Sequence, residues 1–247
     1  TAIVERVATA MLNKGAAWGL LDRHDEEMTA YDQVVSYFGD SADPALQERV
    51  ATAWINKAMM QGELDRWEAA IESYQQAIAV VGESHDSALR ERQASAMLNL
   101  GVALEQVGRE EAGYEVFREL ISRFGAARAT NLAECVAQAY NNLGYPLLLQ
   151  AKKAWEQADV RHTLLTEARD WFVKALDYHP DDAVAMGNLG YTLFLNGQED
   201  YALEPLQRAL NLGGQALYQG TLADVATDTV PLDADFRALL ERTWQAV

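Results

Sequence analysis

The chain has 247 residues, 49% of them hydrophobic, so it is long and apolar enough to bury a core and is not a disordered chain. Its 37 acidic and 20 basic residues leave a net charge of −17, which repels phosphate backbones and anionic lipids; we expect neither nucleic acid nor membrane as a partner. The single cysteine, Cys135, excludes an internal disulfide and a thiolate zinc cluster.

Residue usage favours helix over strand. The sequence holds 41 Ala and 30 Leu against 5 Pro and 6 Phe, and we therefore predict an all-α protein. No stretch approaches the roughly 20 apolar residues that span a bilayer. The opening residues lack the pattern of a signal peptide, so we expect a cytoplasmic protein, with removal of an upstream signal left open.

One short pattern recurs five times along the chain. Copies begin at Val7, Val50, Gln93 and Val136, 43 residues apart, and a fifth begins at Val184. Each copy contains a small residue, at Gly15, Ala58, Gly101, Gly144 and Gly190. A fixed period of this kind is typical of repeat architectures in which neighbouring units share one core.

Each copy predicts a pair of helices, A and B. Sixteen residues after the small residue of helix A comes a large residue, at Tyr31, Tyr74, Phe117 and Leu206. In the fourth copy the matching Phe172 comes 28 residues after Gly144, so about twelve residues are inserted there and lengthen both helices. We expect the small residue to allow helix B to cross at close backbone approach.

Helix boundaries follow from capping and turn residues. Asp43 and Asp86 are predicted to cap helix A of the second and third copies. The turns between helices A and B are marked by Asp22, Asp65, Gly108 and Gly197. Helix B is expected to stop at Gly39, Gly82, Gly125, Pro180 and Gly214, where Gly supplies the left-handed conformation and Pro cannot continue a helix.

These landmarks resemble the tetratricopeptide repeat. The Leu100-Gly101, Leu143-Gly144 and Leu189-Gly190 pairs, Ala70 and Ala202, and Pro180 stand where that family has them. The period is longer than the usual one and resembles kinesin light chains and many bacterial repeat proteins. Lys14 and Lys57 replace the family Leu, and Glu27 and Gly113 replace the family Ala.

The resemblance implies a right-handed α-α superhelix of five repeats, at residues 1–42, 43–85, 86–128, 129–181 and 182–214. Residues 215–247 are expected to form capping helices over 217–225 and 233–244, because the last unit of a solenoid has no further neighbour. Thr1 aligns with Pro44, inside a helix, so we expect a fragment of a longer protein with a further domain upstream.

Helix A carries an asparagine at the same position in every copy: Asn13, Asn56, Asn99, Asn142 and Asn188. Asparagine is a mediocre residue inside a helix, and its amide offers the donors and acceptor that an extended peptide backbone requires. The row resembles the asparagine ladder of the O-GlcNAc transferase superhelix. The alternative is that these amides tie helix A to neighbouring backbone, or repeat only because the units were duplicated.

Apolar residues flank the asparagines and are expected to form side-chain pockets in a concave groove. Those expected to contact the peptide are Met59, Val102, Tyr145 and Tyr191. Leu12, Ile55 and Leu98 fit equally well between adjacent A helices. Lys14 and Lys57 either meet an acidic group of the ligand or pair with nearby glutamates.

Catalytic chemistry finds little support, and we expect no enzyme, no cofactor and no metal site. His24, His85, His162 and His179 read as exposed helix-end or loop residues without metal-ligand spacing, and Cys135 lacks an evident histidine partner. The insertion of the fourth copy carries Lys152 and Lys153, which indicates an exposed basic face or a docking edge.

The sequence thus predicts a protein-interaction module that binds an extended peptide or a partner helix in an Asn-lined, otherwise apolar groove. The alternative function is the sensor or scaffold arm of a larger regulatory protein, acting through oligomerisation or domain docking. The partner itself is a protein or peptide whose identity the fold does not specify.

Overall fold

The structure, a computed structural model, describes residues 2–128 and 130–246. Within these residues it contains eleven helices and no strand, so the predicted all-α class is confirmed. Thr1, on which the alignment with Pro44 rests, lies outside the described residues. The helices form two units, Thr1–Cys135 and Val136–Val247, each described separately below.

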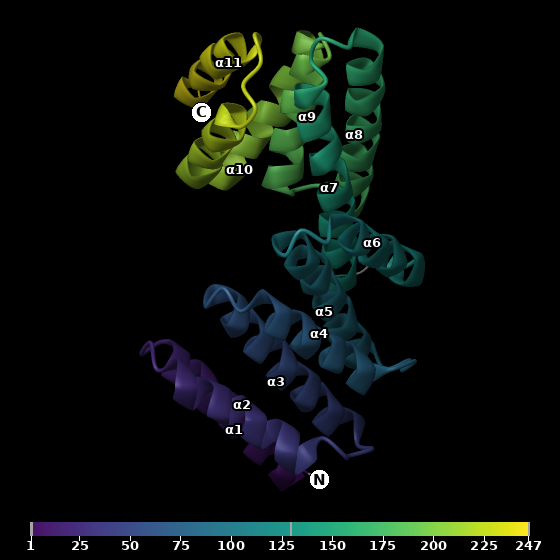
Figure 1. Cartoon of the computed structure of the whole chain (residues 1–247), viewed down its shortest axis with the longest axis vertical. Coiled ribbons are helices and arrows are strands. Elements are labelled where there is room, and N and C mark those ends of the chain that lie inside the picture. The colour runs from purple at the N-terminus through teal and green to yellow at the C-terminus, as the bar shows by residue number, and fades with distance from the viewer. Residues whose placement is uncertain (1, 129, 247) are drawn as a thin grey trace. The chain divides into compact units, whose positions relative to one another are not determined.

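The first unit consists of three helix pairs and the start of a seventh helix (Figure 1). Each helix packs on the next, and α1, α3 and α5 also pack on one another in series. This sequential packing is that of a helical repeat array. The bounds are α1 (Ala2–Gly19), α2 (His24–Phe38), α3 (Pro44–Glu63), α4 (Trp67–Val81), α5 (Ser87–Gln106) and α6 (Glu110–Phe124).

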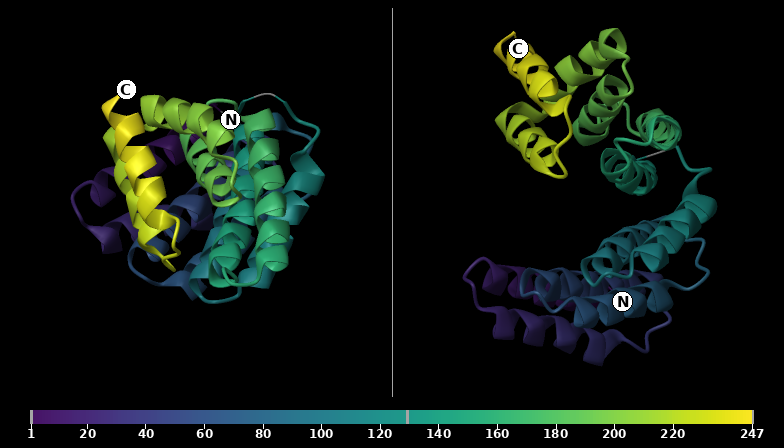
Figure 2. Two further views of the ribbon diagram at one scale, coloured as in Figure 1. Left: turned by 90° about the horizontal axis from the view of Figure 1, so that it is seen from above. Right: turned by 45° about the horizontal axis from the view of Figure 1, so that its top comes forward.

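The second unit holds the rest of the chain. Its helices are α7 (Thr130–Lys153, which begins in the first unit), α8 (Ala158–Tyr178), α9 (Ala183–Leu195), α10 (Glu199–Ala226) and α11 (Asp233–Gln245). Helix α8 packs on α9, α9 on α10, and α10 on α11, which is drawn in yellow in Figure 2.

The insertion of the fourth copy lengthens both of its helices. Helices α7 and α8 have 24 and 21 residues, whereas α3 and α4 have 20 and 15. The prediction of two longer helices is confirmed. The extra residues of α7 include Lys152, which contacts Asp233 of α11, as described below.

The predicted caps and turns fall where expected. Asp43 Oδ1 accepts from the Ala45 amide at 3.0 Å, and Asp86 Oδ1 accepts from the amides of Ala88 and Leu89 at 3.0 and 3.1 Å. These bonds satisfy amides that have no partner within the helix. Four of the five A–B turns contain one residue at positive φ, between 54° and 76°: Asp22, Asp65, Gly108 and Gly197. The turn of the fourth copy, at residues 154–157, contains none.

The predicted stops at the ends of the B helices differ in conformation. Helices α2, α4 and α6 end directly before Gly39, Gly82 and Gly125. Only Gly82 is left-handed, with φ of 55°; Gly39 and Gly125 have φ of −59° and −63°, so the predicted left-handed conformation is wrong there. At those two sites the chain leaves the helix without reversing its φ. Space still favours glycine at Gly39, where a Cβ would lie 2.6 Å from the carbonyl oxygen of Val35.

The core of each unit is built on the repeated small-large pair. A Cβ on Gly101 would lie 2.3 Å from Cε1 of Phe117, and one on Gly15 would lie 2.5 Å from Cε1 of Tyr31. The small residue of helix A therefore packs against a large side chain of helix B, and the predicted close backbone approach is found beside it in the third copy. Backbone does approach backbone at Gly113, whose Cβ would lie 2.8 Å from the carbonyl oxygen of Gly101.

The chain after Gly214, residues 215–246, is here called the C-terminal segment. Gly214 has φ of 56° and ψ of −149° and breaks α10, after which the helix resumes to Ala226. Helix α11 follows, and the two stretches agree with the helices predicted over 217–225 and 233–244. Val225, Phe236 and Leu240 are at most 1% exposed, so the C-terminal segment contributes directly to the core of the second unit.

Candidate functional site

The five repeated asparagines lie on the A helices and are not deeply buried. Asn13 on α1 is exposed, whereas the other four are partly buried, two in each unit: Asn56 on α3, Asn99 on α5, Asn142 on α7 and Asn188 on α9. Because α1, α3 and α5 pack in series, the first three asparagines occupy equivalent places on successive helices of the first unit.

Some of these amides already have partners within the chain. Asn99 Nδ2 donates to the Ser95 carbonyl of its own helix at 3.0 Å, and Asn188 Nδ2 donates to Asn141 Oδ1 at 2.9 Å. The first bond lies within one helix and uses only the Nδ2 group, so it does not involve the amide oxygen of Asn99. The second links α9 to α7, which is the structural role weighed against the ladder.

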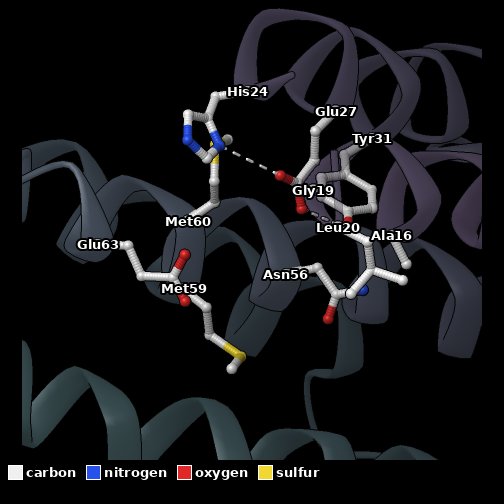
Figure 3. A pocket seen from close by; sticks show the side chains of 10 residues that line it. All are labelled: Ala16, Gly19, Leu20, His24, Glu27, Tyr31, Asn56, Met59, Met60 and Glu63. Carbon is white, nitrogen blue, oxygen red and sulfur yellow. Dashed lines mark hydrogen bonds and ion pairs between the residues drawn. The ribbon is translucent and has the colours of Figure 1, made fainter. Parts of the chain in front are cut away.

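A pocket of about 380 Å³ lies where α1, α2 and α3 meet in the first unit (Figure 3). It brings together two residues predicted to bind peptide, Asn56 and Met59, with residues that the sequence analysis did not assign to a site. Its lining consists of Ala16, Gly19 and Leu20 from α1 and the turn after it, His24, Glu27 and Tyr31 from α2, and Asn56, Met59, Met60 and Glu63 from α3.

The base of the pocket is a buried polar group. Glu27 and Tyr31 are 8% and 2% exposed, and the Tyr31 hydroxyl donates to Glu27 Oε1 at 3.0 Å. Burial and the adjacent Glu27 carboxylate raise the pKa of Tyr31, so the phenol stays protonated and remains a donor. The Asn56 amide interacts with the same hydroxyl. Gly19 leaves room for the carboxylate, since a Cβ there would lie 2.7 Å from Glu27 Oε2.

The mouth of the pocket is apolar and open. Leu20 is 88% exposed and Met59 50% exposed, and Figure 3 shows Met59 and Met60 extending from the same stretch of α3. Lys57, predicted either to meet a ligand or to pair with a glutamate, instead lies 2.5 Å from Asp32 Oδ1 and over the Trp54 ring. Its charge is therefore matched within the chain.

Tyr191 does not line an open groove, contrary to the prediction. It is 3% exposed, its hydroxyl donates to Asp233, and its ring centroid lies 4.4 Å from that of Phe236. Tyr145 is partly buried, and its hydroxyl donates to Asp224 Oδ1 at 2.9 Å. Both tyrosine hydroxyls thus donate to residues of the C-terminal segment. The position of that segment cannot be predicted from the repeat period.

The remaining apolar positions divide between groove and core. Val102 on α5 is partly buried and stays a candidate. Leu12, Ile55 and Leu98 are 7%, 5% and 8% exposed, which favours the alternative that they pack inside the first unit. Two residues of the first copy, Ala16 and Leu20, line the pocket described above. Ala16 holds the place that Met59 has in the second copy.

Two buried charged residues were missed or misplaced by sequence reasoning. Lys152, predicted to lie on an exposed basic face, is 3% exposed, whereas its neighbour Lys153 is exposed. Glu27 carried a signal: it replaces the small residue that is fully buried elsewhere, as at Ala70 and Ala202. A carboxylate at a core position of a repeat is the feature that could have identified the pocket.

The side chains that could ligate a metal ion or act as a nucleophile are scattered over the described residues. None of their His, Cys, Asp and Glu side chains gather in a group of three that could hold a metal ion. Burial raises the pKa of Cys135 to about 11, which makes its thiol a poor nucleophile. None of the helices in the described ranges is both long and apolar enough to cross a bilayer.

Two segments of the chain match the tetratricopeptide repeat family, residues 51–80 and residues 171–204. The first covers most of α3 and α4; the second runs from the end of α8 through α9 into α10. Neither match is to an enzyme family, and the repeat is typically non-catalytic. No curated protein matches the sequence at a significant level.

Solved structures with a similar fold include two repeat proteins of low sequence identity. BtubC (BKLC) from P. vanneervenii has a TM-score of 0.52 and 17% identity, over 86% of this chain and 90% of that one. MamA has a TM-score of 0.50 and 16% identity, over 82% of this chain and 95% of that one. With its family matches at residues 51–80 and 171–204, its consecutive helix pairs and its small-large packing pairs, the chain contains tetratricopeptide repeats.

Proposed function

We propose that the protein binds an extended peptide along the A-helix face, with the pocket between α1, α2 and α3 as one anchoring point. Tetratricopeptide repeats are generally protein-protein interaction modules, which sets the class of partner. The observation that carries the proposal is the pocket itself, which joins Asn56 and Met59 of the second copy with Ala16 and Leu20 of the first. Ala16 and Met59 hold equivalent places on their A helices.

The chemistry of these residues suits a peptide. An amide side chain can donate to a backbone carbonyl and accept from a backbone N–H, so it binds main chain without selecting a sequence. Methionine is flexible and polarizable and adapts to ligand side chains of different shape. Asn13, Asn56 and Asn99 would then bind successive stretches of main chain, while Met59 and Val102 contact side chains.

In the second unit the proposal extends to Asn142 and Asn188 but not to Tyr191, which is buried. A second pocket there is lined by Asn188 together with small residues of α9 and α10, among them Gly187, Gly213 and Ala216. In each unit, then, one asparagine of the row lines a pocket, Asn56 in the first and Asn188 in the second, with different neighbours around it.

The test is the triple variant Asn56→Ala, Asn99→Ala, Asn142→Ala. Binding is measured against an immobilised library of ten-residue, N-acetylated and C-amidated peptides, and then by fluorescence anisotropy on those that wild-type protein retains. We expect at least tenfold weaker binding, because amide contacts to the main chain are lost, with a nearly unchanged Tm. The control is Asn211→Ala on α10. Like the Asn99 amide, the Asn211 amide donates to a carbonyl of its own helix, that of Gln207, at 2.9 Å.

Two results would contradict the proposal. If wild-type protein retains no peptide, the groove is not a peptide site. If the triple variant loses stability in step with binding while the Asn211→Ala control does not, the asparagines act in folding, as the alternative interpretation holds.

A further inference from the structure

The pocket between α1, α2 and α3 contains an excess of negative charge. Its lining includes two carboxylates, Glu27 and Glu63, and one imidazole, His24, and no lysine or arginine is among the lining residues. An ionised carboxylate taken out of water is costly unless a cation or several donors face it. The pocket therefore favours a positively charged occupant.

Glu27 is the centre of this charge. Oε1 accepts a hydrogen bond from the Tyr31 hydroxyl, whereas the imidazole nitrogen Nδ1 of His24 lies 3.7 Å from Oε2, beyond hydrogen-bond distance. That imidazole nitrogen is itself buried and makes no hydrogen bond. Figure 3 shows the two groups facing each other across the upper part of the pocket. The Glu27 side chain, which is 11% exposed, thus lines the pocket with one oxygen, Oε2, that accepts no hydrogen bond from the described residues.

The rest of the pocket matches the stem of a long basic side chain. Leu20, Met59 and Met60 supply apolar contacts, and lysine and arginine carry alkyl stems that pack on such surfaces while the charged head reaches a polar group. Glu63 stands at the exposed rim, on α3, and provides a second carboxylate along the path. The volume of about 380 Å³ is far larger than one water molecule requires.

We propose that this pocket receives a lysine or arginine side chain of the bound peptide, with Glu27 and Glu63 as its partners and Leu20 and Met59 along its stem. The inference rests on the proposed peptide-binding function and adds selectivity to it. The net charge of −17 favours the same ligands at long range, by attracting basic peptides before they dock.

The experiment compares four versions of one library peptide retained by wild-type protein, with Lys, Arg, norleucine or Glu at the selected position. Norleucine keeps the alkyl stem and removes the charge. For wild-type protein we expect at least tenfold tighter binding of the Lys or Arg peptide than of the norleucine peptide. For Glu27→Gln the ratio should fall close to one, with unchanged affinity for norleucine, because the amide keeps the shape and loses the charge.

Two further variants keep the result interpretable. Glu63→Gln alters an exposed residue, should leave the Tm unchanged, and should lower the ratio several-fold. Glu68→Gln, on the exposed surface of α4, removes the same charge outside the pocket and should leave the ratio unchanged. Peptide binding without preference for a basic residue overturns this inference and leaves the peptide-binding function standing. Equal effects of Glu27→Gln and Glu68→Gln also overturn it, because the attraction would then be general.

Discussion

Lys152 of α7 and Asp233 of α11 form an ion pair whose side chains are both at most 1% exposed, with Nζ 3.5 Å from Oδ2. Lys152 also donates to the Val225 carbonyl at 3.2 Å, and Asp233 accepts from the Val230 amide at 2.8 Å. Burial lowers the pKa of Lys152, and the attraction of Asp233 opposes that shift. The pair joins the C-terminal segment to α7.

Replacing Lys152 should destabilise the second unit strongly. Lys152→Met leaves Asp233 buried without its cation, a situation that typically costs about 3 to 5 kcal/mol. Lys153→Met is the matched control: the Lys153 side chain is 66% exposed and its Nζ lies 3.7 Å from Asp228 Oδ2, so less than about 1 kcal/mol should be lost. Urea unfolding monitored by circular dichroism measures both. Equal stability of the two variants would show that the buried pair adds nothing.

Adding one methyl group at Gly101 should lower stability, although alanine ordinarily favours a helix. Its Cβ would lie 2.3 Å from Cε1 of the fully buried Phe117, and such overpacking costs about 1 to 3 kcal/mol. Gly220→Ala in α10 has nothing within 4 Å and should gain up to about 1 kcal/mol. Thermal unfolding should therefore shift in opposite directions, and a gain in both variants would refute the packing argument.

Stability should fall as the pH rises through the titration of Glu105. Burial, with a smaller effect of Glu110, raises its pKa from 4.5 to about 7, so the folded state holds this proton more tightly than the unfolded state does. The free energy of unfolding therefore falls between about pH 4.5 and 7 and stays at its lower value above pH 7. For this partly exposed group we expect a decrease of about 1 to 3 kcal/mol.

Glu105→Gln should remove that loss. The variant is expected to be more stable than wild type at pH 8, with the difference shrinking toward pH 4, as measured by urea unfolding at fixed ionic strength. Glu115→Gln, at an exposed position of α6, serves as the control for a lost carboxylate. A pH-independent difference between wild type and Glu105→Gln would contradict this account.

The helices and their turns were predictable because each copy repeats the same local signals. Asp22, Asp65, Gly108 and Gly197 all adopt the positive φ that a tight A–B turn requires, and the Asp caps form as expected. These features depend on residues that are close in sequence, and the repetition of the pattern in register makes them recognisable from the sequence. Gly39 and Gly125 show the limit, since a glycine after a helix does not have to be left-handed.

The site was only partly predictable, because its contacts join residues that no period relates. Asn56 and Met59 were identified from their register, and both line the pocket. The burial of Tyr191 and Lys152 depends on where the C-terminal segment folds back, and that segment lies outside the repeat pattern. Glu27 stands where other copies have a small residue, such as Ala70. Those copies therefore do not indicate which side chains the Glu27 carboxylate contacts.

Tyr31 occupies the place that Phe117, Phe172 and Leu206 hold in the third, fourth and fifth copies. Its ring fills the space over Gly15 as theirs fill the space over their own glycines, but its hydroxyl also binds Glu27 at the base of the pocket. Tyr74 of the second copy carries the same hydroxyl, but Ala70 stands there in place of Glu27, so it is the carboxylate that gives Tyr31 its second role. Binding chemistry can in this way be added to a single copy of a repeated scaffold while the spacing of its helices is left untouched.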